Sequence, residues 1–234
     1  MLFRSLECGT HPPRLQASIE ALVRENSVPT AAFNNCSGKH SGFLSTALAH
    51  GEPTKGYIKY DHPVQKRLRQ VMSDLSGEQA DDYAYGTDGC GIPTLATPLK
   101  SLARAMASMA DPSRLSNRHA EAAARIRDAM NAEPFMVAGT GRFCTRVNGA
   151  LIGVAQVKTG AEGVFCGMLP TLGLGIAVKM WDGAGRAAEI AMATLLGHLG
   201  VLAGGQKDEF IHPPVKNVVG LLVGEMRPAK SWLG

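Results

Sequence analysis

The chain has 234 residues, 45% of them hydrophobic and 19% charged, with a formal net charge of +4, which is enough apolar material for a globular core. The basic residues are scattered and no apolar run approaches the about 18 residues of a membrane span, so we expect neither a nucleic-acid nor a membrane partner. Five cysteines without a short-range framework, after an N-terminus unlike a signal peptide, predict a reducing, cytoplasmic location.

Hydrophobic periodicity predicts five helices in the first half of the chain. Ser37 is expected to cap the second helix, Asp61 the third and Thr97 the fourth. Pro63 and Pro98 fit the first turns of the third and fourth helices. The predicted helices cover residues 14–26, 37–50, 61–77, 97–112 and 117–134.

The second half of the chain changes to β-type segments separated by glycine-rich turns. An apolar helix is expected at residues 186–204, followed by a last strand at residues 218–226. Helices followed by a strand meander, a helix and a strand predict an α+β fold. The absence of repeats and linkers from the sequence favours a single domain over residues 1–234. The meander strands are expected within residues 149–160, 163–169 and 174–183.

The densest group of reactive side chains lies in NNCSGKHSGF, residues 34–43. Cys36 and Lys39 are three residues apart at a helix start, so both side chains lie on one face of the first turn. A helix N-terminus and a neighbouring ammonium both favour a thiolate, which could act as a nucleophile or a metal ligand. The alternative is equally open at this point: Cys36 is a buried small side chain and Lys39 a surface charge.

Two further segments carry polar side chains in glycine-rich turns. In GTDGCGIPT, glycines flank Cys90 and Asp88 precedes it by two residues, although an aspartate in a turn commonly bonds only its own backbone. Arg142 follows a Gly-Thr-Gly turn, and Lys158 begins a Lys-Thr-Gly tripeptide like that of penicillin-binding enzymes and serine β-lactamases. A tripeptide alone is a weak signal.

Taken in order along the chain, several segments resemble the asparaginase II family, the Rhizobium-type L-asparaginases. This resemblance implies a fold similar to the serine β-lactamases and penicillin-binding proteins. It also implies the hydrolysis of L-asparagine to L-aspartate and ammonia by a serine nucleophile that a lysine follows three residues later. A homodimer is one oligomeric state that the resemblance admits. The segments that carry it are NNCSGKHSG, DHPVQKR, GTDGCGIPT, VAGTGRFCT, VKTGAEGVFCG and PVKNVVGLLVGEMRP.

The resemblance further implies one zinc ion bound by Cys36, Lys39 and Cys90. Asp88 matches a position suited to the α-ammonium group of the substrate, where a carboxylate is the natural partner. Lys158 and Arg142 are candidates for contact with the substrate carboxylate or for support of the active site. Ser37 and His40 would orient their neighbours. A lysine ligand of ordinary pKa costs about 4.6 kcal/mol to deprotonate at pH 7, so zinc affinity should weaken as the pH falls. We expect the zinc to be structural or tuning, fixing the geometry of the two loops rather than activating water.

The sequence departs from the family pattern in one respect: no serine has a lysine three residues after it. We therefore expect the chain to be the C-terminal two-thirds of a usual member, without its nucleophile and inactive alone. Three interpretations remain open: an active enzyme whose true start precedes Met1, an inactive remnant, or a non-catalytic zinc- and amino-acid-binding module paired with a separate N-terminal chain. A cysteine hydrolase with Cys36 as nucleophile and His40 as base is the alternative mechanism.

Overall fold

The structure, a computed structural model, describes residues 2–232, with side chains from residue 4 onward. Its internal contacts divide the chain into two compact units. Unit 1 comprises the chain up to residue 74 and residues 78–97, and unit 2 comprises residues 75–77 and the chain from residue 98 on. The single domain expected over residues 1–234 stays a prediction.

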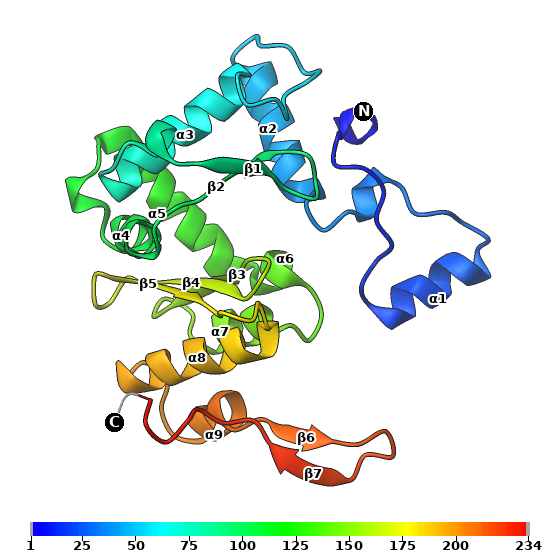
Figure 1. Cartoon of the computed structure of the whole chain (residues 1–234), viewed down its shortest axis with the longest axis vertical. Coiled ribbons are helices and arrows are strands. Elements are labelled where there is room, and N and C mark those ends of the chain that lie inside the picture. Colours follow the sequence, from blue (N-terminus) through cyan, green and yellow to red (C-terminus); the bar gives the residue numbers. More distant parts are fainter. Residues whose placement is uncertain (1, 233–234) are drawn as a thin grey trace. The chain divides into compact units, whose positions relative to one another are not determined.

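Unit 1 consists of helices and one short hairpin, coloured blue to cyan-green in Figure 1. The three helices expected here form close to the predicted bounds, but their caps differ. Cys36, rather than Ser37, is the N-cap of α2. The ring Nδ1 of His62, not Asp61, accepts the Val64 N–H at the start of α3. The elements are η1 (Leu2–Ser5), α1 (Gln16–Arg24), η2 (Ala31–Phe33), α2 (Ser37–Ala49), α3 (Pro63–Ser76), η3 (Ala80–Asp82), β1 (Tyr85–Thr87) and β2 (Pro93–Leu95).

Unit 2 combines helices with an antiparallel three-stranded sheet in the order β3-β4-β5. The α+β class predicted from the sequence is thus confirmed. Its elements are α4 (Leu99–Ala110), η4 (Pro112–Arg114), α5 (Asn117–Ala132), α6 (Pro134–Ala138), α7 (Phe143–Ala150), β3 (Gln156–Thr159), β4 (Val164–Leu169), β5 (Leu174–Lys179), α8 (Gly185–His198), α9 (Gly205–Ile211), β6 (Pro214–Lys216) and β7 (Leu222–Glu225).

Two local predictions in unit 2 were wrong and a third was incomplete. The segment expected to begin a strand at residue 149 completes α7, and β3 starts only at Gln156. Pro98, not Thr97, is the N-cap of α4. The single strand expected at residues 218–226 is the second half of a hairpin: the chain turns after β6, with Asn217 accepting the Gly220 N–H, and β7 follows.

The sheet of unit 2 is covered on both faces by helices, α4 on one and α8 on the other (Figure 1). Gly175 makes the close packing of α4 possible, whereas a Cβ at Gly167 would make only ordinary contacts with α8. A Cβ at Gly175 would lie 2.1 Å from the Ala103 carbonyl oxygen of α4, and one at Gly167 would contact Met192 of α8 at 3.5 Å. Gly175 pairs with Met168, the neighbour of Gly167, so the two glycines face opposite sides. This stack is compatible with the β-lactamase-like fold, which stays a prediction.

Across residues 2–232, no helix combines the length and the apolar character that a bilayer span requires.

Candidate functional site

Helix α2 and the hairpin β1–β2 bring four of the candidate residues together in unit 1. Cys36 caps α2 and Lys39 lies in its first turn, while Asp88 and Cys90 lie in the loop that joins the two strands. The loop is a tight turn: Asp88 N–H donates to Ile92 O and Gly91 N–H to Asp88 O, both at 2.8 Å. Gly91 has a φ of +89°, a conformation that favours glycine, so this glycine is required by the turn itself.

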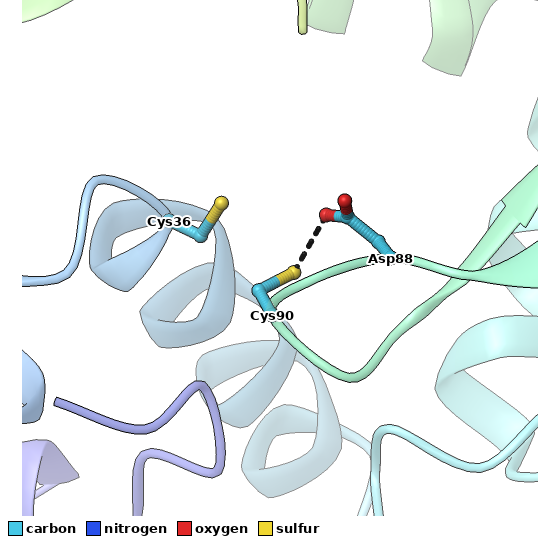
Figure 2. A group of neighbouring side chains, drawn as sticks. All are labelled: Cys36, Asp88 and Cys90. Atoms are coloured by element: carbon cyan, nitrogen blue, oxygen red, sulfur yellow. Dashed lines mark hydrogen bonds between the residues drawn. The ribbon is translucent and has the colours of Figure 1, made fainter. Parts of the chain in front are cut away.

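The polar atoms of this cluster are close to one another. The two Sγ atoms of Cys36 and Cys90 and a carboxylate oxygen of Asp88 all lie within 4.8 Å of each other (Figure 2). Cys90 Sγ donates a hydrogen bond to Asp88 Oδ2 at 2.9 Å. Lys39 Nζ lies 3.3 Å from Cys90 Sγ and 3.6 Å from Asp88 Oδ2. Sequence reasoning from the resemblance had linked these four residues across about fifty positions.

The charge states of the cluster follow from its contacts. Burial, together with the hydrogen bond to Asp88, raises the pKa of Cys90 to about 11. That same hydrogen bond, helped by the Gly89 N–H and by Lys39, holds the pKa of Asp88 below its usual range. Burial alone would lower the pKa of Lys39, but Cys90 and the neighbouring acidic groups outweigh it and the pKa is raised. In the metal-free protein at neutral pH, the cluster therefore holds a thiol at Cys90, a carboxylate and an ammonium.

Cys36 is positioned by Asn34, a buried asparagine to which the sequence analysis assigned no role. Asn34 Oδ1 accepts the backbone N–H of Cys36 at 2.8 Å, and its Nδ2 donates to the carbonyl oxygens of Cys8 at 2.8 Å and Gly9 at 3.2 Å. The Cys8 side chain in turn packs with Cys90 and Ile92 in a small buried cluster. The first asparagine of NNC was the sequence signal, because asparagine commonly bonds backbone groups before a helix.

His40 and Ser37 occupy different environments on α2. His40 is fully buried, its Nδ1 lies 2.6 Å from Tyr57 Oη, and its Nε2 has no hydrogen-bond partner within the described part of the chain. Burial lowers its pKa, which keeps the imidazole neutral. Ser37 N–H donates to Asn34 O, and Ser37 O accepts the Ser41 hydroxyl. A cysteine hydrolase would need one ring nitrogen of His40 as its base. However, Nδ1 is hydrogen-bonded to Tyr57 and Nε2 is buried.

Lys158 and Arg142 belong to unit 2, where the structure places them near two cysteines and a glutamate. Lys158 is exposed and lies opposite Cys166 in the β3–β4 pairing. Arg142 caps α7, and its charge counteracts the burial that raises the pKa of Glu189 on α8. Glu189 was missed, although a lone carboxylate within an otherwise apolar helix is a recognisable signal.

The donor set of the unit 1 cluster fits zinc. Zinc prefers tetrahedral sites with thiolate sulfur at about 2.3 Å and nitrogen or oxygen at about 2.0–2.2 Å, so two ligand atoms lie about 3.3–3.8 Å apart. The sulfur and oxygen atoms of the cluster lie within 4.8 Å of one another, so zinc binding would draw them closer together. Cys36 and Cys90 would supply the two sulfurs and Lys39 a nitrogen, and the carboxylate of Asp88 lies beside them.

Comparison with known proteins gives one result for this chain. The model of the L-asparaginase II family matches residues 3–228. A search of curated proteins found no match. The match does not support the expectation that the N-terminal third is missing.

Proposed function

Because the chain belongs to the L-asparaginase II family, we propose that it carries the metal- and substrate-binding site of an L-asparagine amidohydrolase. The reaction indicated for the family is hydrolysis of L-asparagine, which yields L-aspartate and ammonia. The observation that carries the proposal is the convergence of Cys36, Lys39, Asp88 and Cys90 at the start of α2.

We assign Cys36, Lys39 and Cys90 as the zinc ligands. When bound, zinc supplies a fixed positive charge that stabilises two thiolates and ties the first turn of α2 to the loop at residues 88–92. This role is structural and tuning rather than the activation of water. Because Cys90 and Lys39 hold their protons in the metal-free protein, both must be deprotonated for binding.

Asp88 is the group that we assign to the α-ammonium of the substrate. Its side chain is 36% exposed, so a ligand can reach it, and its low pKa keeps it ionised. Oδ1 accepts the Gly89 N–H, while Oδ2 accepts the thiol of Cys90. Loss of the Cys90 proton removes that donor, so Oδ2 becomes available to an ammonium group. Metal binding and substrate binding are therefore expected to be coupled.

The remaining candidates take supporting roles in this proposal. Lys158 as a supporting residue and Arg142 as a substrate-binding residue stay predictions from the sequence, and Ser37 and His40 would hold the first turn of α2. A cytoplasmic location and a homodimer complete the proposal, and size-exclusion chromatography with light scattering tests the latter.

The sequence has no Ser-x-x-Lys pair, so we do not expect the 234-residue chain alone to release ammonia. This observation favours one second candidate, a non-catalytic protein that binds zinc and an amino acid. The cysteine-hydrolase mechanism is less favoured, because His40 Nδ1 is bonded to Tyr57.

One experiment separates these functions. The purified chain is loaded with zinc, titrated with L-aspartate by calorimetry, and incubated with L-asparagine in an ammonia assay. We expect stoichiometric zinc, aspartate binding and no ammonia. Steady ammonia release would contradict the expected inactivity, and its loss in Cys36→Ala but not on chelation would indicate a cysteine hydrolase. Absence of both zinc and aspartate binding would overturn the proposed site.

A further inference from the structure

Tyr57 lies fully buried beside α2, and its hydroxyl makes two hydrogen bonds that no sequence motif indicates. The hydroxyl accepts the backbone N–H of Glu7 at 2.8 Å and lies 2.6 Å from His40 Nδ1. A tyrosine hydroxyl can donate one hydrogen bond and accept two, so it can bond the Glu7 N–H and His40 Nδ1 at the same time.

Three chain segments meet at this hydroxyl. Each continues directly to residues in or beside the Cys36–Lys39–Cys90 site. Glu7 precedes Cys8, whose side chain packs with Cys90 and Ile92. His40 follows Lys39 in the first turn of α2. Ile58, the neighbour of Tyr57, packs on the same cluster and lies 3.3 Å from where a Cβ at Gly91 would be.

Tyr57 is itself held on both sides. Gln65 Nε2 of α3 donates to its carbonyl oxygen at 2.9 Å. The preceding residue, Gly56, donates its N–H to Glu7 Oε1 at 2.8 Å. The ring packs against His40 at a centroid distance of 5.4 Å and against Phe43 at 6.2 Å. A tyrosine fixed in this way can hold the segments bonded to it in place, in addition to filling space in the core.

We propose that Tyr57 is a positioning residue for the Cys36–Lys39–Cys90 site: its hydroxyl holds the first turn of α2 and the segment at Cys8 in the arrangement that brings Lys39 to Cys90. The metal aspect rests on the proposed function, whereas the geometric aspect does not. Phenylalanine at this position would keep the ring but remove the partner of the Glu7 N–H and of the buried His40 Nδ1.

The test compares Tyr57→Phe with Tyr83→Phe, a control that removes a tyrosine hydroxyl bonded at 2.9 Å to Glu78 at the surface of the same unit. In the metal-free protein, the alkylation rate of each cysteine is followed by mass spectrometry. We expect Tyr57→Phe to accelerate labelling of Cys90, while Cys144 and Cys166 in unit 2 keep their rates and serve as internal controls. In the zinc-loaded protein, we expect zinc affinity to fall by about tenfold, and Tyr83→Phe to change neither quantity.

An unchanged Cys90 rate, or equal acceleration at every cysteine, would overturn the proposal, because the first shows no positioning and the second only a loss of global stability. If the wild-type protein binds no zinc, the proposed metal site fails, yet the labelling of Cys90 still decides the role of Tyr57. Should Tyr57→Phe not fold, His40→Asn and His40→Leu provide the comparison, since these side chains have similar shapes and only asparagine offers the tyrosine an acceptor. Faster Cys90 labelling in the leucine variant supports the proposal, and equal labelling overturns it.

Discussion

Zinc binding at the cluster should depend steeply on pH, and Lys39→Met should reduce that dependence by one proton. Burial and the hydrogen bond to Asp88 raise the pKa of Cys90 to about 11, so deprotonating this thiol at pH 7 costs about 5 kcal/mol. The pKa of Lys39 is raised as well. A titration between about pH 6.5 and 8.5 therefore starts from the protonated form of both groups. Each proton released on binding changes the affinity about tenfold per pH unit. These two groups alone therefore give about a hundredfold rise in affinity for each unit of pH increase.

The assay is a competition titration of zinc against a chromophoric chelator at several pH values, with calorimetry in buffers of different ionisation enthalpy to count the protons. The logarithm of the affinity should rise with pH with a slope about one unit smaller in Lys39→Met than in the wild-type protein. Lys55→Met removes an exposed lysine of the same unit and should leave the slope unchanged. Equal slopes in the wild-type protein and Lys39→Met would refute the assignment of Lys39 as a ligand that loses its proton.

Two further substitutions test other parts of the account. Asp88→Asn removes the charge proposed to hold the substrate ammonium, so calorimetry should show L-aspartate binding weakened by about 1.5 kcal/mol, roughly tenfold, and unchanged affinity would contradict that role. Gly175→Ala places a Cβ 2.1 Å from a backbone oxygen of α4 and should lower the free energy of unfolding by about 3 kcal/mol or more, whereas Gly149→Ala, with open space around it in α7, should be neutral or stabilising. Chemical denaturation measures both, and equal stabilities would show that the close packing of α4 on the sheet is wrong.

Helices α1–α5 and α8 form where the apolar spacing of the sequence predicted them, whereas α6, α7 and α9 were not predicted. The caps were less predictable: Ser37 was expected to cap α2, but Cys36 occupies the cap position, and Asn34 accepts the Cys36 N–H. The strand expected from residue 149 failed for a related reason. Buried Val147 and Leu151 extend the helical packing of α7, so tertiary contacts override the β-leaning composition of the segment.

The residues of the candidate site also fall into two groups: those that a sequence motif marks, and those that only the fold brings together. Cys36, Lys39, Asp88 and Cys90 stood out because their residue types and glycine-rich surroundings are unusual, and the resemblance linked them. Tyr57 and Glu7 did not, since their contribution is a hydrogen bond between residues that lie 50 positions apart in the sequence. Partners of this kind are set by the fold, and no local spacing encodes them.

The most direct test of the central claim is X-ray absorption spectroscopy at the zinc edge on the purified chain reconstituted with one equivalent of zinc. The account predicts two sulfur ligands at about 2.3 Å together with nitrogen or oxygen at about 2.0–2.1 Å. Cys36→Ser and Cys90→Ser should each remove one sulfur ligand. A spectrum without sulfur ligands, or one unchanged by both substitutions, would contradict a metal site at the start of α2.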